Sequence, residues 1–203
     1  MSNSNTPRVD IASSKRRQVV ESLPRNTNLS GIPLKIKESA IELKNFVKQW
    51  SKLHVTGIAV LNSIKTLKID SMRSSERELY PQGLQERCDQ LQHVLDKMNS
   101  CFTNLAVLVQ QLKALVELDN LQGGDKGPIH LSWSTGKFGQ AYQEIYNAYA
   151  KELALKNVIK EEVAHSPKKE CLSYYITSWT LQPFISNECK VLLETIFYET
   201  DLR

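Results

Sequence analysis

The stretch of sequence that decides the fold runs from Leu84 to Leu118 and reads LQERCDQLQHVLDKMNSCFTNLAVLVQQLKALVEL. Its apolar residues alternate by four and three positions, a spacing that brings them to one face of an α-helix and that no β-strand produces. The members of this series are Leu84, Cys88, Leu91, Leu95, Met98, Phe102, Leu105, Val109, Leu112 and Val116. The spacing predicts a long helix with a coiled-coil-like seam.

A second apolar column widens the predicted apolar face of this helix. It consists of Val94, Cys101, Leu108 and Leu115. A simple two-stranded coiled coil usually carries charge at such flanking positions. Because one neighbour cannot cover so wide a face, we expect the helix to pack in a bundle or to share the face between its own chain and a partner.

Another heptad pattern precedes this helix and begins near Pro33. One series is Ile36, Leu43, Trp50 and Ile64, and the complementary series is Phe46, Leu53, Val60 and Leu67. Gly57 occupies the remaining core position, where a missing side chain lets a neighbouring backbone or a bulky partner side chain approach closely. The segment Asp70 to Gly83 is rich in turn-forming and charged residues, so the two patterns predict an antiparallel helical hairpin.

Shorter helical patterns follow a Gly-containing connector. One helix is expected from Ser134 or Thr135 to about His165, with an apolar face formed by Phe138, Tyr142, Ile145, Tyr149 and Leu153. Ser166-Pro167 suits a helix start, and Gln182-Pro183 is expected to end that helix, because proline lacks an amide donor. A last short helix carries Val191, Leu192, Leu193, Ile196 and Phe197.

These patterns predict an all-α protein, in which a long antiparallel coiled-coil-like helical hairpin is followed by a smaller C-terminal helical bundle. We expect a disordered tail over residues 1–32, the hairpin over 33–120, a connector over 121–136 and the C-terminal helical region over 137–203. The tail has few large apolar side chains and therefore cannot offset the entropy of ordering.

Composition narrows the possible functions. The chain is 41% hydrophobic and 24% charged, with a net charge of +4. Its basic residues are interspersed with acidic ones, so direct binding of nucleic acid is not expected. No run approaches the roughly 20 apolar residues that cross a bilayer, so no membrane partner is expected. The four cysteines lack metal-type spacing, which indicates a reduced intracellular compartment and neither a metal nor another cofactor.

No residue pattern typical of catalysis is found. The four histidines are isolated from one another and from the cysteines, without a metalloprotease pair or a nucleophile elbow. One alternative is a small helical enzyme that uses the carboxylates of Glu152, Glu161 and Glu162, although charges on helices usually form a solvated face. Another is DNA binding through the basic tail, whose Lys15-Arg16-Arg17 triplet also suits nuclear import.

The C-terminal third carries a family resemblance. Its signature residues are Trp133 and Phe138, Tyr149-Ala-Lys-Glu-Leu153, Glu162-Val-Ala-His165, Leu172-Ser-Tyr174 and Trp179-Thr-Leu-Gln-Pro-Phe184. These resemble the cyclin-dependent kinase 2-interacting protein family, and the likeness continues upstream over roughly residues 35 to 203. The resemblance implies a nuclear, non-enzymatic adaptor that associates with cyclin-dependent kinase 2, with a Cdc7-type kinase and with a checkpoint kinase adaptor in DNA replication.

The resemblance also implies a second role, as a subunit of an AAA-type ATPase complex. That complex contains another small helical companion protein and acts in replisome upkeep and large ribosomal subunit maturation. Any ATP hydrolysis would belong to the partners, because the family supplies no catalytic residue.

The candidate partner interface combines the wide helix face with the signature aromatics. Its members are Trp50, Gly57, Val94, Cys101, Leu108, Leu115, Trp133, Phe138, Tyr149, Trp179, Pro183 and Phe184. The three tryptophans are the expected anchors, since large aromatic side chains dominate interface energetics. The alternative is that they pack only the chain's own core.

Overall fold

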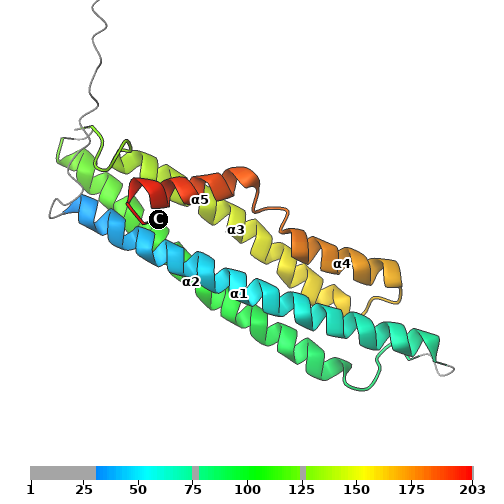
Figure 1. Ribbon diagram of the computed structural model, residues 1–203. Coiled ribbons are helices and arrows are strands. Elements are labelled where there is room, and N and C mark those ends of the chain that lie inside the picture. The colour runs from blue at the N-terminus through cyan, green and yellow to red at the C-terminus, as the bar shows by residue number, and fades with distance from the viewer. Residues whose placement is uncertain (1–30, 75–77, 124–126, 203) are drawn as a thin grey trace, which may run out of the picture.

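The computed structural model describes residues 31–74, 78–123 and 127–202 of the 203-residue chain (Figure 1). These residues form five helices and no strand, which confirms the all-α prediction. The helices are α1 (Ile32–Arg73), α2 (Leu84–Leu121), α3 (Thr135–Val163), α4 (Lys169–Leu181) and α5 (Asn187–Glu199). The basic triplet at 15–17 lies outside the described residues.

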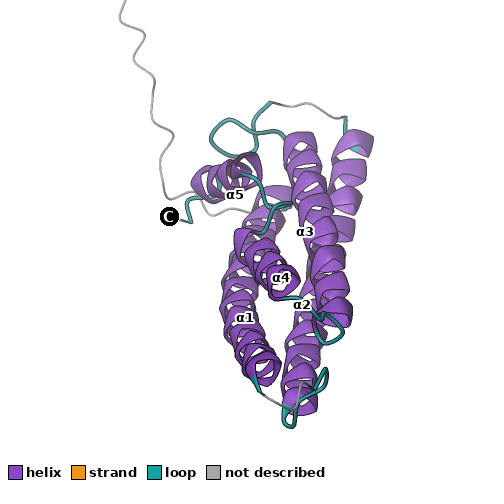
Figure 2. Ribbon diagram, turned by 90° about the vertical axis from the view of Figure 1, so that its right-hand side faces the viewer, coloured by secondary structure: helices purple, strands orange, loops and turns teal. Residues whose placement is uncertain are grey.

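The five helices make one antiparallel bundle. In Figure 1, α1 and α2 form the predicted hairpin, α3 returns beside α2, and α4 and α5 run back along the opposite side. The helix α2 contacts both α1 and α3, and α4 and α5 each contact α1 and α3. Figure 2 shows α4 lying between α1 and α3. The C-terminal helices α4 and α5 therefore pack against α1 and α3, and together they take the place of a fourth helix in the bundle.

The wide apolar face of α2 is covered from two directions by its own chain. Ten of its residues are buried, among them Val94, Cys101 and Leu108 of the flanking column. By length and composition alone α2 could cross a membrane, a criterion that a core helix also meets. In this structure the apolar face packs against α1 and α3.

The seam of α1 is only half as predicted. Ile36, Leu43, Trp50 and Ile64 are buried, and Gly57 completes their series. In the complementary series Phe46 is buried as predicted, whereas Leu53, Val60 and Leu67 are only partly buried. The second buried column runs instead through Ala40, His54, Leu61 and Lys68. The polarity of His54 and Lys68 concealed this column from a search for apolar residues.

Lys68 is buried because distant carbonyl groups receive its ammonium. Its Nζ atom donates to the carbonyl oxygen of Leu79 at 3.2 Å and to that of Ala164. Burial lowers the pKa of Lys68 below its ordinary value. Leu79 precedes α2 and Ala164 follows α3, so the burial of Lys68 depends on tertiary packing.

The break between α4 and α5 follows local backbone chemistry. The helix α4 ends at Leu181, and Gln182 adopts a left-handed conformation with φ of 47° immediately before Pro183. The Ser186 side chain then caps α5 by accepting a hydrogen bond from the amide of Cys189 at 3.3 Å. The predicted end of α4 is confirmed, but its start is at Lys169, with Lys168 and not Ser166 at the N-cap position.

Candidate partner-binding surface

The signature segment 179–184 joins α4 to α5 and is locked onto α1. The indole Nε1 of Trp179 donates to the carbonyl oxygen of His54 at 3.1 Å. Its ring lies against Gly57, where a Cβ atom would come within 2.2 Å of the indole. The predicted close approach at Gly57 thus occurs, and the bulky side chain comes from α4 of the same chain.

Trp50 binds a second residue of segment 179–184, which we call the α4–α5 joint. Its Nε1 atom donates to Oε1 of Gln182 at 2.9 Å. The Trp50 ring also packs edge-on against Tyr149, with centroids 5.0 Å apart. Since Trp50 is 1% exposed, its indole N–H depends on Gln182 as an acceptor.

A buried ion pair supports the joint from α3. Nζ of Lys156 lies 2.9 Å from Oε1 of Glu152, and both side chains are fully buried. Lys156 also donates to the carbonyl oxygen of Trp179 at 3.2 Å, and its Nζ lies 4.2 Å from the centroid of that residue's ring. Oε2 of Glu152 accepts from the amide of Phe184 at 3.2 Å. The pair therefore satisfies backbone groups that the break between α4 and α5 exposes.

The electrostatic surroundings of this joint disfavour extra charge. Burial lowers the pKa of Lys156 below its ordinary value, and the neighbouring Glu152 opposes that shift. Burial, followed by the repulsion of Lys156, lowers the pKa of His54 to about 4. His54 is therefore neutral near pH 7.

The three carboxylates of the enzyme alternative do not converge. Glu152 is engaged with Lys156, whereas Glu161 and Glu162 are exposed. In the parts of the chain that the structure describes, no group of three or more His, Cys, Asp or Glu side chains is placed to hold a metal ion. The buried pair therefore stabilises the interior, and the candidate functional surface lies on the outside of the bundle.

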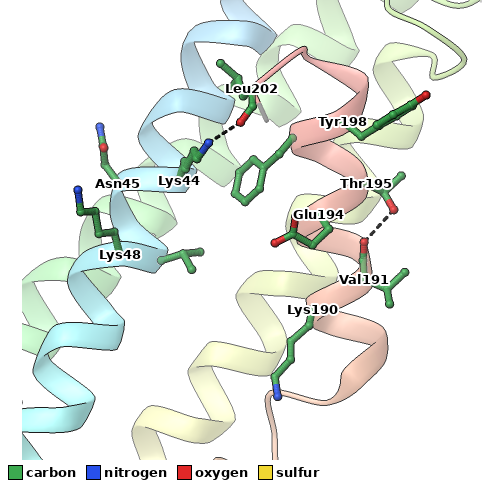
Figure 3. A pocket seen from close by; sticks show the side chains of 11 residues that line it. Lys44, Asn45, Lys48, Lys190, Val191, Glu194, Thr195, Tyr198 and Leu202 are labelled. Carbon is green, nitrogen blue, oxygen red and sulfur yellow. Dashed lines mark hydrogen bonds between the residues drawn. The ribbon is translucent and has the colours of Figure 1, made fainter.

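A groove of about 960 Å³ lies between α1 and α5 (Figure 3). One wall carries Lys44, Asn45, Val47 and Lys48 of α1. The opposite wall carries Lys190, Val191, Glu194, Thr195, Phe197 and Tyr198 of α5, and Leu202 closes one end. No sequence pattern indicates this groove, because its two walls belong to α1 and α5, which are far apart in the chain.

Apolar and basic groups share this groove. Val191 is 64% exposed, although α5 as a whole is packed against α1 and α3. The Nζ atom of Lys44 donates to the carbonyl oxygen of Leu202 and lies 5.7 Å from the centroid of the Phe197 ring. The C-terminal residues are thereby tied to α1, and the groove keeps a defined wall.

A second hollow, of about 550 Å³, borders the other side of α5. It is lined by Glu144 and Ala148 of α3 and by Glu188, Val191 and Thr195 among the residues around α5. Val191 and Thr195 line both hollows. The helix α5 therefore forms a ridge, with a basic groove on one side and acidic residues on the other.

Comparison with known proteins finds relatives that match over nearly the whole chain. No protein-family model matches the chain. Cyclin-dependent kinase 2-interacting proteins from Mus musculus and Homo sapiens are 28% and 27% identical to it over 200 residues, which cover 89% of this chain and 94% of each relative. The protein of that name from Xenopus laevis is 26% identical over 196 residues. The chain is a relative of the cyclin-dependent kinase 2-interacting proteins.

In this relative of the cyclin-dependent kinase 2-interacting proteins, most of the predicted interface residues lie in the chain's own core. Nine are buried: Trp50, Gly57, Val94, Cys101, Leu108, Trp133, Phe138, Tyr149 and Trp179. Leu115 is partly buried, and Pro183 and Phe184 are exposed. The three tryptophans thus follow the core alternative, because the chain's own helices cover the apolar faces that carry them.

The Trp133 end of the bundle is also held internally. The Trp133 ring packs against Phe138 with centroids 5.1 Å apart. The carboxylate of Glu199 accepts hydrogen bonds from the amides of Ser132 and Trp133 at 2.8 and 3.2 Å. This contact fixes the end of α5 to the connector and so helps to position the groove wall.

Proposed function

We propose that this chain is a non-catalytic adaptor that binds cyclin-dependent kinase 2. The observation that carries the proposal is its similarity to proteins named for that interaction, over 89% of this chain and 94% of the relatives. Because the match spans nearly the whole of both chains, it is not restricted to one shared helix.

The physical basis of binding is burial of exposed apolar groups beside the signature joint. Phe184 is 43% exposed, and its amide is held by Glu152, whereas Val191 is 64% exposed on α5. Apolar area removed from water contributes about 25 cal/mol per Å². A rigid presentation reduces the entropy lost on association. The α4–α5 joint therefore holds the neighbouring surface in place, and that surface contacts the partner.

The adaptor assignment is also consistent with the chemistry of the interior. The one fully buried carboxylate among the three candidate catalytic residues is neutralised by Lys156 and accepts from a backbone amide. Both of its oxygens are thus engaged by the chain itself. A base poised for catalysis would instead face a cleft that admits substrate.

The finer part of the proposal follows from the family resemblance. The chain acts in the nucleus with a Cdc7-type kinase and a checkpoint kinase adaptor, in replication and the response to DNA damage. It also serves as a subunit of an AAA-type ATPase complex with a small helical companion, in replisome upkeep and large ribosomal subunit maturation. ATP hydrolysis in that complex belongs to the ATPase subunits.

Binding to the kinase is tested with purified full-length chain and cyclin-dependent kinase 2. We expect sedimentation velocity to show a complex of the two proteins. Calorimetry should give a Kd of about 1 μM or tighter, equivalent to a binding free energy of roughly −8 kcal/mol. Absence of a complex at protein concentrations about tenfold above this Kd would overturn the kinase proposal. A Glu161→Gln variant is a suitable control, because this exposed side chain lies away from the groove.

The ATPase and nuclear parts need a separate experiment. A tagged chain purified from nuclear and cytoplasmic fractions is analysed by mass spectrometry and by sizing of the complex. Recovery from the nuclear fraction with AAA-type ATPase subunits and a small helical companion, in fixed ratio, supports these parts. Recovery only as a free chain, or only from the cytoplasm, contradicts them.

A further inference from the structure

We propose that the groove between α1 and α5 docks an acidic amphipathic helix of a partner protein. The inference rests on the proposed adaptor function and gives the chemistry of the segment that the adaptor accepts. Carboxylates of the partner helix meet Lys48 and Lys190 at the walls, and Lys44 adds to the positive charge near the closed end. Its apolar side chains cover the exposed apolar groups between those walls.

Charge is the first support for this occupant. Lys44 and Lys48 lie one helical turn apart on α1, and Lys190 lies on the facing wall (Figure 3). Glu194 is the one carboxylate among the groove-lining residues. Within the described residues, no carboxylate lies within ion-pair distance of any of the three lysines. With three lysines against one carboxylate among its lining residues, the groove presents net positive charge to an incoming segment.

The rest of α1 extends this charge along the bundle. Residues 43–69 contain five lysines and neither Asp nor Glu, and Lys52 is exposed one helical turn beyond the groove residue Lys48. The lysines at 44, 48 and 52 recur every four residues and so share one face of α1. A partner helix with carboxylates at the same spacing can meet several of them at once.

Apolar exposure is the second support. Val47 is partly buried on the α1 wall, and Val191 is largely exposed on the α5 wall. The Phe197 ring and Leu202 line the groove near its closed end. An apolar floor with a charged rim is the arrangement that receives an amphipathic helix through side chains at i, i+3, i+4 and i+7. The floor also favours a protein helix over nucleic acid, since phosphates would leave these apolar groups exposed to water.

The chain's own N-terminal segment has the wrong charge for this groove. Residues 1–30 carry five basic residues, namely Arg8, Lys15, Arg16, Arg17 and Arg25, against Asp10 and Glu21. Placing this segment in the groove would bring like charges together, which is unfavourable. A segment from another protein, rich in Asp and Glu, is the occupant that the charges select.

The test uses a photo-crosslinking amino acid in the full-length chain. Benzoyl-phenylalanine replaces Val191, which borders both the groove and the second hollow, or, as a matched control, Val107 on α2. Lys48 and Lys190 line the groove and not the second hollow, so charge reversal at these two lysines assigns a Val191 crosslink to the groove. Both valines are well exposed, at 64% and 50%, and Val107 does not line the groove. After irradiation in cells, mass spectrometry identifies the crosslinked peptide. We expect the Val191 position, but not the Val107 position, to yield a peptide of another protein with a clear excess of Asp and Glu.

A charge-reversal variant then tests whether Lys48 and Lys190 bind that peptide. The Lys48→Glu/Lys190→Glu variant is expected to reduce the Val191 crosslink by about tenfold or more, as for loss of close charge pairs across an interface. A control variant, Lys97→Glu/Lys113→Glu, carries the same charge change at exposed positions of α2 and should leave the yield unchanged. Circular dichroism establishes that both variants remain folded.

Four outcomes overturn the groove proposal. They are a Val191 crosslink to residues 1–30, a crosslink to a second copy of the chain, a crosslink to nucleic acid, and no groove-specific crosslink. If wild type and charge-reversed chains bind cyclin-dependent kinase 2 equally and no acidic peptide is found, the groove inference fails alone. If an acidic peptide is captured but purified kinase does not bind, the kinase proposal fails alone.

Discussion

The Trp179 indole occupies the space where a side chain on residue 57 would be. A Cβ atom built on Gly57 lies 2.2 Å from Cζ2 of Trp179, closer than atoms that are not bonded can approach. The contact couples α1 to α4, because the same indole donates to the carbonyl oxygen of His54 one turn earlier in α1. A glycine in the middle of a long helix is thereby explained by tertiary packing.

The first prediction concerns this contact. Gly57→Ala should destabilise the protein by about 1–3 kcal/mol, because overpacking outweighs the gain in helix propensity of about 1 kcal/mol. Urea unfolding followed by circular dichroism measures the effect. The control is Gly136→Ala in α3, where a Cβ atom meets nothing within 4 Å and should be neutral or stabilising. Equal effects at the two positions would contradict the packing argument.

The second prediction concerns the buried ion pair. Lys156→Met should cost about 3–5 kcal/mol, because it leaves the Glu152 carboxylate buried without its counter-charge. Glu152→Leu should cost a similar amount by stranding the Lys156 ammonium. Replacing both residues together should cost much less than the sum of the two single changes. A double-mutant cycle in urea measures this coupling, and strict additivity would show that the pair does not act as a unit.

The third prediction concerns Gln182, which combines a left-handed backbone with a hydrogen bond to Trp50. Gln182→Ala should destabilise the chain by about 1–3 kcal/mol, because the buried indole N–H loses its acceptor. Gln182→Gly loses the same acceptor but relieves a left-handed backbone that costs other residues about 1 kcal/mol. The Gly variant should therefore unfold at a higher urea concentration than the Ala variant. The reverse order would show that backbone strain at this position is unimportant.

The fourth prediction concerns pH and His54. Burial holds the pKa of His54 at about 4 in the folded chain, below the ordinary value of 6.5. Between these values the unfolded chain binds more protons than the folded chain, so stability increases with pH across this window. The contribution of neutral His54 to the free energy of unfolding is fully present above pH 6.5 and is lost as the pH falls toward 4. Unfolding free energies measured from pH 4 to 7 should depend less on pH in His54→Gln than in the wild type.

Helix identity and direction were accessible from sequence, because burial repeats with the local period of the helix. The four-and-three spacing over residues 84–118 predicted α2, and the turn-rich segment before it predicted the hairpin with α1. Gln182-Pro183 predicted the end of α4 from the covalent geometry of proline. The width of the apolar face on α2 correctly indicated more than one neighbouring helix.

The second buried column of α1 was not accessible in this way. Lys68 can be buried only because Leu79 and Ala164 bring carbonyl oxygens to its ammonium. His54 is buried beneath Trp179, whose indole uses the carbonyl oxygen of this same histidine. Partners this far along the chain leave no periodic signal in the sequence.

The sequence by itself determined which faces of this protein are apolar, where its helices break, and the family to which it is similar. The tertiary structure alone decided which molecule covers each face: Trp50 and Trp179 meet α1, α3 and α4 of their own chain, so they do not lie on the surface. It also brought Lys44 and Lys190 to opposite walls of one groove. The physical reason is that apolar patterning specifies that a surface must be buried, whereas the partner that buries it is set by chain reversal and packing over long separations.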